Sequence, residues 1–185
     1  MVVFRPDKSN QLYSKQILHP DEKTYFVEGR EQIILMIDKI KIALAICYES
    51  LQQEHFDHAN KIGADIYLAS VAKSQAGIEK AFGHFPKIAL KFSTPTLMVN
   101  SIGHCYNFES AGQSSIWNEN GNIIGQLENK NEGILIYDSA LDKMKPAEST
   151  RDNTNIKHSY FRASKRFYAR KDRRIFGSGF LGKTR

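Results

Sequence analysis

Residues 39–55 read KIKIALAICYESLQQEH and decide the fold, because the spacing of apolar side chains changes within them. In the first half, large apolar side chains alternate with small or polar ones, at Ile40, Ile42, Leu44 and Ile46. This period of two predicts a buried strand. From residue 51 to residue 62 apolar residues recur at helical spacing, and Gly63 is a helix stop signal. Cys47 therefore falls at a strand-to-helix junction.

Cys47 has two interpretations at this point. Nucleophiles are often found at such junctions, because the sharp turn exposes the side chain and the N-terminus of the helix stabilises negative charge on it. A lone cysteine is otherwise more often a small buried hydrophobic residue than a catalyst. The local sequence leaves both interpretations open.

The rest of the body predicts an α/β fold with a mixed sheet, because strands and helices alternate in the middle and hairpins flank them. Apolar runs indicate strands at residues 2–4, 33–37, 40–47, 64–71, 95–101 and 132–138. Asp38 and Lys39 are expected to join two of these strands in a tight hairpin.

Two further elements complete this expected body. Residues 77–93 have helical spacing, with Pro86 near the start of the helix. Residues 114–127 read as a hairpin, in which Asn120 and Gly121 supply the positive φ angles of a type I′ turn.

Composition restricts the class of protein. A chain of 185 residues has the size of one domain, and no apolar run approaches the ~18 residues that span a bilayer. The first ten residues do not have the pattern of a signal peptide, and the two cysteines have no framework spacing. We therefore expect a reduced, cytoplasmic protein with no membrane association. No metal-binding spacing is found, and no cofactor is expected.

The charge divides the chain in two. Residues 139–185 hold 13 Lys or Arg and 4 Asp or Glu, whereas the other 138 residues hold 13 and 16. We predict a domain at residues 1–138 and a basic, flexible tail at residues 139–185. Aromatic residues among these basic ones would suit single-stranded nucleic acid, but basic tails are usually only solvated, and nucleic acid is not favoured as a partner.

Several stretches, in this order and spacing, resemble the nitrilase superfamily, the carbon–nitrogen hydrolases. The stretches are LYSKQILHPDEKTYFVEG at 12–29, ICYES at 46–50, GADIYLASVAKS at 63–74, and MVNSIG at 98–103 followed by YNFESAGQSSIWNENGNIIGQL at 106–127. The resemblance runs from about Val2 to Asp138. It implies a four-layer α-β-β-α sandwich and hydrolysis that uses a glutamate, a lysine and a cysteine.

The resemblance assigns roles to single residues. Cys47 matches the nucleophile, Lys15 the lysine of the family, and Glu22 a second glutamate that many members place near both. The backbone N–H of Tyr48 would help to bind the oxyanion. The first glutamate of the family, its general base, matches no residue, because only 14 residues precede Lys15 and the resemblance covers the C-terminal part of the domain. The expected fold is accordingly a partial sandwich.

Other residues have weaker expected roles. Ser70, Val71 and Asn100 are expected to line the substrate pocket, since ligands gather at the carboxyl ends of sheet strands. Glu49 is expected to cap the helix that follows Cys47. Cys105 is interpreted as a bystander thiol.

Two functions remain open from the sequence. The first is an amidase-type carbon–nitrogen hydrolase that cleaves a small non-peptide amide or carbamoyl compound through a cysteine thioester. The second is a catalytically impaired fragment or pseudoenzyme that lacks the base and acts only with a partner chain. Either one implies an uncovered apolar sheet face, so we expect a homo-oligomer or a complementing chain.

Overall fold

The computed structural model describes residues 1–5, 8–138 and 167–169. Its centre is a six-stranded mixed sheet in the order β10-β9-β6-β5-β4-β3. The strands are β3 (Ile34–Ile37), β4 (Ile40–Ile46), β5 (Ile66–Val71), β6 (Thr96–Asn100), β9 (Ser115–Trp117) and β10 (Ile123–Gln126). β4, β5 and β6 are parallel to one another, and the outer strands pair antiparallel. The expected α/β fold with a mixed sheet is therefore confirmed.

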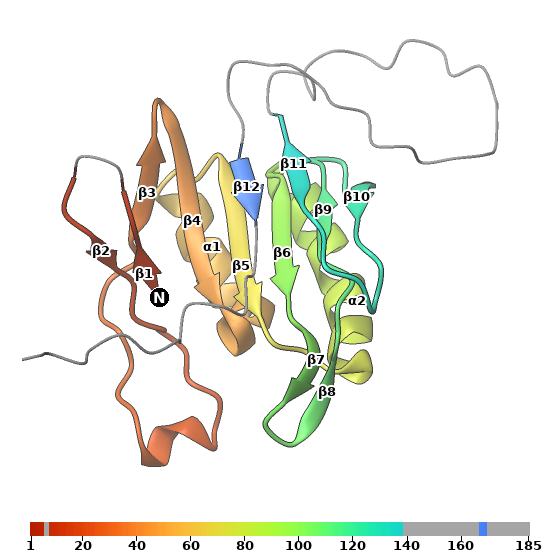
Figure 1. Cartoon of the computed structure of the whole chain (residues 1–185). Helices are drawn as coiled ribbons and strands as arrows, with labels where there is room; N and C mark the ends of the chain where they lie inside the picture. The colour runs from red at the N-terminus through yellow and green to blue at the C-terminus, as the bar shows by residue number, and fades with distance from the viewer. Residues whose placement is uncertain (6–7, 139–166, 170–185) are drawn as a thin grey trace, which may run out of the picture.

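Both α-helices cover the same face of this sheet (Figure 1). α1 (Gln53–Lys61) connects β4 to β5, and α2 (Gln75–Phe92) connects β5 to β6. Parallel neighbours need such crossover connections, which is why the change of period after β4 matters for the fold. Within the described part of the chain, no helix combines the length and apolar character that a bilayer span requires.

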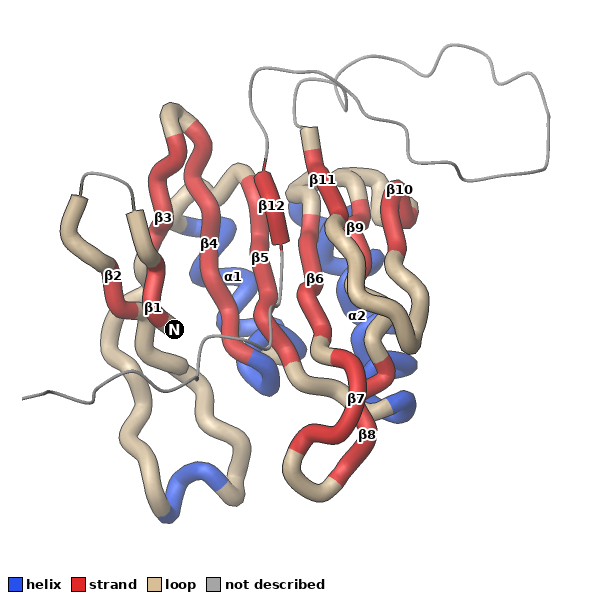
Figure 2. Tube along the Cα trace, viewed as in Figure 1, coloured by secondary structure: helices blue, strands red, loops and turns tan. Residues whose placement is uncertain are grey.

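Short elements complete the described chain, as Figure 2 shows by type. They are the antiparallel pairs β1 (Val2–Val3) with β2 (Gln11–Leu12), β7 (Ile102–Cys105) with β8 (Phe108–Ala111), and β11 (Leu135–Tyr137) with β12 (Phe167–Ala169), and the 3₁₀ helices Glu22–Thr24 and Cys47–Leu51. The tail expected at residues 139–185 lies outside the described residues, except for β12.

The two faces of β4 pack against different layers, as its alternating pattern predicts. Ala43 and Ala45 are fully buried in the cluster between the sheet and the helices, and their small side chains let α1 and α2 approach closely. Ile42 and Leu44 belong to a second cluster on the opposite face.

The described residues cover that opposite face only in part. Tyr13 and Tyr137, from the β1–β2 and β11 segments, pack on it. A cavity of about 290 Å³ remains, lined by apolar side chains that include Leu35, Ile37 and Leu68. The helix layer and the sheet thus correspond to one half of an α-β-β-α arrangement.

Two local predictions were wrong in detail. Pro86 lies well inside α2 and not near its start. The β9–β10 turn is not type I′, because Gly121 has a φ of 75° but Asn120 does not have a positive φ. Gly121 N–H instead donates to the Asn118 carbonyl at 2.9 Å, and a register irregularity follows, as in hairpins that combine a type I turn with a bulge.

The hairpin at Asp38 is confirmed, with a φ of 54° at that residue. The β7–β8 hairpin was not expected from the sequence. The α-helix after Cys47 begins only at Gln53, because the five residues Cys47–Leu51 form a separate 3₁₀ helix.

Candidate functional site

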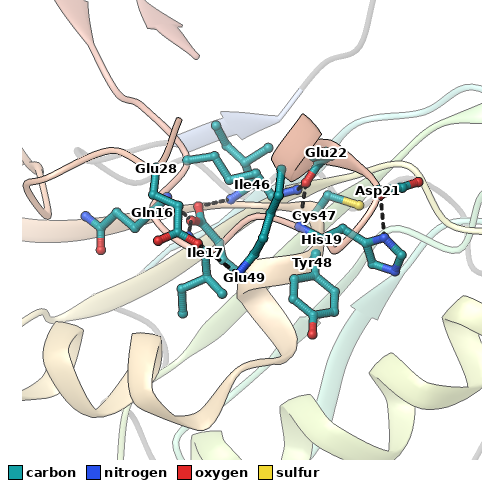
Figure 3. Close-up of polar contacts among 12 residues, drawn as sticks. Gln16, Ile17, His19, Asp21, Glu22, Glu28, Ile46, Cys47, Tyr48 and Glu49 are labelled. Atoms are coloured by element: carbon teal, nitrogen blue, oxygen red, sulfur yellow. Dashed lines mark hydrogen bonds and ion pairs between the residues drawn. The ribbon is translucent and has the colours of Figure 1, made fainter. Parts of the chain in front are cut away.

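Cys47 sits at the carboxyl end of β4, where the chain turns sharply. Ile46 ends the strand in an extended conformation, and Cys47 takes a φ of 51°, which non-glycine residues rarely adopt. The Ser50 hydroxyl donates a 2.6 Å hydrogen bond to the Cys47 carbonyl and holds the turn. Strained, well-held turns of this kind gather at functional sites and push a side chain outward. In Figure 3 the Cys47 sulfur points to the side where Glu22 and Asp21 lie.

Glu49 locks this turn from the inside. Its carboxylate is fully buried and accepts two hydrogen bonds on each oxygen. Oε1 accepts from the backbone N–H of Ile46 at 2.6 Å and from the Tyr13 hydroxyl at 2.7 Å. Oε2 accepts from the backbone N–H of Gln16 at 2.6 Å and of Ile17 at 3.3 Å (Figure 3). Glu49 does cap the turn, as expected, and it also fastens the turn to the segment that carries Lys15.

A chain of buried hydrogen bonds continues from Tyr13. Its hydroxyl lies 2.9 Å from Nε2 of His55, and Nδ1 of His55 lies 2.8 Å from the Tyr67 hydroxyl. If Tyr13 donates to Glu49, His55 must donate from Nε2 and accept at Nδ1 from Tyr67, so that every proton has one acceptor. This pattern needs a neutral imidazole. Burial, with the charge of His58, lowers the pKa of His55 to about 4.

Lys15 and Glu22 form an ion pair, and Glu22 lies on the side to which the Cys47 sulfur points (Figure 3). The backbone N–H of His19 donates to the same Glu22 oxygen at 2.7 Å. Burial opposes ionisation of Glu22, but these hydrogen bonds and the charge of Lys15 outweigh it and keep the pKa of Glu22 below its usual value. The Gly29 N–H donates to the Lys15 carbonyl at 2.7 Å and closes the loop that carries Glu22.

The carboxyl ends of β5 and β6 complete the site. The Cys47 thiol donates to the Ala72 carbonyl across 3.8 Å, which puts the segment after β5 against the candidate nucleophile. Asn100, at the end of β6, accepts from the Lys73 N–H at 2.8 Å and donates to the Lys73 carbonyl at 3.1 Å. Its amide also donates to the Gly112 carbonyl at 2.8 Å. Asn100 therefore fixes the backbone at Lys73.

Lys73 is the second ammonium group of the site. Its residue is only 6% exposed. Burial lowers the pKa of Lys73; negative charge on Cys47 opposes that shift, and the cations Lys15 and Lys80 add to it. Lys73 thus interacts electrostatically with both Cys47 and Lys15.

The other residues expected at the site lie at its margin. Ser70 is half-buried and pairs in register with Ile46, one residue before the cysteine. Val71 belongs to the core cluster under the helices. Tyr48 follows Cys47 in the first turn of the 3₁₀ helix, where backbone N–H groups have no partner within the helix.

Sequence reasoning missed Tyr13, His55 and Lys73. A tyrosine and a histidine at apolar positions give no signal of a shared hydrogen-bond chain. Lys73 did have a signal, because it follows the same strand as Ser70 and Val71, whose carboxyl end was already expected to face the site. Within the described residues, no cluster of His, Cys, Asp or Glu could hold a metal ion.

The chain is similar to known proteins in sequence and in structure. The family described as carbon-nitrogen hydrolase matches residues 1–148. A search of curated proteins gave no match. A glutamine-dependent NAD⁺ synthetase from Acinetobacter baumannii, solved with ADP, is 19% identical with a TM-score of 0.63, over 74% of this chain and 28% of that chain.

Two amidase structures from Nesterenkonia sp. AN1 are also similar. A cysteine-to-serine mutant, described as from the nitrilase superfamily, is 22% identical with a TM-score of 0.57, over 66% of this chain and 48% of its own. A second mutant, with the acetamide moiety of fluoroacetamide added covalently at its active-site cysteine, is 22% identical with a TM-score of 0.55, over 63% and 45%. This chain thus spans less than half the length of these structures. Because the family match covers most of its 185 residues, the chain belongs to the carbon-nitrogen hydrolase family.

Proposed function

We propose that this chain carries the nucleophile of an amidase-type hydrolase that cleaves a small non-peptide amide or carbamoyl compound through a cysteine thioester. The observation that carries the proposal is Cys47 itself, held at a φ of 51° at a strand end with its thiol facing the Ala72 carbonyl. The amidase relatives, one of which is modified at its active-site cysteine, support the choice of reaction.

The proposed reaction has two halves. The Cys47 sulfur attacks the amide carbon, a carbon–sulfur bond forms, and the thiol proton passes through a base to the leaving nitrogen as the carbon–nitrogen bond breaks. Water then attacks the thioester, releases the carboxylic acid and restores the thiol. In both halves the Lys15 ammonium and the Tyr48 N–H would stabilise the oxyanion, and Glu22 would orient Lys15.

The proposed reaction also requires a general base. Glu49 is unsuited, because its two oxygens already accept four hydrogen bonds and are fully buried. Glu22 is more open, but its lowered pKa makes it a weak base. General acid–base catalysis contributes about 10²–10⁴-fold, so we expect slow turnover unless another carboxylate reaches Cys47.

The direct test measures ammonia release from simple neutral amides and carbamoyl compounds by the purified 185-residue chain. Cys47→Ala should abolish any release above background, whereas Cys105→Ala should keep it. Mass spectrometry of the chain incubated with an activated ester should detect an acyl group on Cys47 even where turnover is slow. Release that persists in Cys47→Ala would refute the proposal.

A second candidate function is that the chain acts only together with a partner chain. The sheet face that the described residues cover only in part supports it, because that face holds a cavity of about 290 Å³ and exposes the apolar side chain of Ile37. The same face suits a homo-oligomer. Sedimentation of the purified chain, alone and with extract of its source cells, distinguishes a monomer, a self-assembly and a mixed complex.

A further inference from the structure

Lys73 is a largely buried cation that has no counter-ion among the described residues. Its residue is 94% buried, and none of the ion pairs among the described residues involves it. Within the part of the chain that the structure describes, the charges that shift its pKa are those of Cys47, Lys15 and Lys80, none of which is a carboxylate. A cation that gives up much of its hydration without a carboxylate partner is costly, so a site that keeps one is suited to an anion.

Hydrogen bonds and packing fix the main chain and the aliphatic stem of Lys73. Asn100 and the backbone N–H of Ala111, at 2.9 Å from the Lys73 carbonyl, hold its main chain. Its aliphatic stem runs along Gly77 of α2, where a Cβ would lie 3.1 Å from the Lys73 Cβ and 3.4 Å from its Cγ. The preceding residue, Ala72, accepts from the Cys47 thiol. The main chain of Lys73 is therefore held next to the residue that faces the Cys47 thiol, and the charge of Lys73 interacts with that of Cys47.

Lys15 does not need an additional anion as a counter-ion. Its charge is already balanced by Glu22 in the ion pair. A thiolate on Cys47 would neutralise the positive charge of Lys73 only in the free enzyme. The sulfur becomes neutral when it forms the thioester, and Lys73 would lose that partner during turnover. An anionic group on the substrate would balance Lys73 in both halves of the reaction.

We propose that Lys73 is a specificity-determining residue that binds a carboxylate on the substrate, so that the preferred substrates are half-amides of dicarboxylic acids and similar amides with a second, anionic end. This inference rests on the proposed chemistry at Cys47. The hydrolysed bond is the amide, and the carboxylate takes no part in bond making or breaking.

The test uses alkylation of the full chain, which needs no turnover. Two matched pairs of reagents differ in a carboxylate: iodoacetate against iodoacetamide, and N-iodoacetylglycine against N-iodoacetylglycinamide. Peptide mapping gives the rate at Cys47, and Cys105 in the same sample serves as the reference thiol. The ratio of anionic to neutral rate, corrected by Cys105, is compared among wild type, Lys73→Met, Lys73→Arg and Lys80→Met.

The proposal predicts that Lys73→Met lowers the corrected ratio about tenfold or more for at least one pair, as expected for the loss of one charge-assisted hydrogen bond. Lys73→Arg should retain most of the ratio. Lys80→Met removes an exposed cation on α2 and should change the ratio less than about twofold. An unchanged ratio in Lys73→Met overturns the proposal. Equal slowing of both reagents also overturns it, because Lys73 would then act on the thiol and not on the substrate.

A binding measurement decides the case in which Cys47 reacts too slowly to map. Calorimetry with the Cys47→Ala chain compares succinamate, which carries a carboxylate, with neutral succinamide. Tighter binding of succinamate that disappears when Lys73→Met is added supports the proposal. Equal or tighter binding of succinamide overturns it. Failure of amide hydrolysis alone would count against the proposed function and leave these two readouts intact.

Discussion

The Tyr13 hydroxyl donates a 2.7 Å hydrogen bond to the Glu49 carboxylate, across 36 positions of the chain. Tyr13 lies two residues before Lys15, and Glu49 lies two residues after Cys47. One buried contact thus sets the position of the segment that carries the lysine against the turn that carries the cysteine. Both ends of this contact are less than 3% exposed, so the bond acts in a medium where an unmade hydrogen bond is costly.

Tyr13→Phe should destabilise the protein. The change leaves Glu49 without one donor and His55 without its acceptor, and an unsatisfied buried polar group costs about 1–3 kcal/mol. We expect a lower urea midpoint with an unchanged m-value. Tyr25→Phe is the matched control, because Tyr25 is 80% exposed, and its midpoint should not move. Equal midpoints for the two variants would show that the buried bonds contribute nothing net.

His55 should make the protein sensitive to mild acid. Its pKa is about 4 in the folded protein, from burial first and the charge of His58 second, against an ordinary 6.5. Below pH 6.5 the unfolded chain takes up a proton that the folded chain refuses, so stability falls as the pH drops. The fall continues to about pH 4 and amounts to roughly 3 kcal/mol for this group.

The measurement is the free energy of unfolding between pH 7 and pH 4. His55→Gln should be less stable at pH 7 but should lose less stability than wild type on going to pH 4. The exposed neighbour His58 provides a comparison: His58→Gln removes only the smaller cause of the shift and keeps the buried imidazole, so its curve should differ from that of wild type much less than the His55→Gln curve does. A His55→Gln curve parallel to that of wild type would contradict the assignment of a buried neutral imidazole.

The sequence predicted the strands and the junction at Cys47 because these depend on local apolar periodicity. It could not predict the partners of Glu49, which come from residues 13–17 and are brought close only by the packing of the β1–β2 segment on the sheet. The resemblance singled out Lys15 and Glu22, and the structure places them in an ion pair. The turn at Asn120 was misjudged because the same dipeptide suits two hairpin types that differ by one residue in loop length.

Two glycine substitutions should shift stability in opposite directions. Gly83 lies on the exposed side of α2, and a Cβ there would meet nothing within 4 Å. Gly83→Ala should therefore stabilise the protein by about 0.5–1 kcal/mol, since glycine is a poor helix former. Gly121 has a φ of 75°, and a Cβ there would lie 2.6 Å from the Pro86 carbonyl oxygen. Gly121→Ala should cost about 1–3 kcal/mol. Thermal melts of both variants test the pair, and a stabilising Gly121→Ala would refute the described turn.

Cys47 and not Cys105 should be the reactive thiol. Both thiols are free and half-buried, so exposure alone does not distinguish them. Cys47 differs in its setting, because the Lys73 charge acts on it and its turn pushes the sulfur outward. Limited treatment with iodoacetamide followed by peptide mapping should find the label mainly at Cys47. Preferential labelling of Cys105 would count against Cys47 as the nucleophile.

Association should depend on one face of β3. Ile37 and Met36 are adjacent and both partly exposed, at 39% and 50%, but Ile37 lines the apolar cavity whereas Met36 is on the helix side of the sheet. We expect wild type to self-associate through the cavity face, because a large exposed apolar face favours burial against another surface. Ile37→Lys should lower the mass measured by light scattering toward that of a monomer, and Met36→Lys should leave it unchanged. If wild type is already a stable monomer, or if both variants dissociate equally, the cavity face is not the contact surface. Amide hydrolysis measured on the same samples then shows whether Cys47 acts in the single chain or only in the assembly.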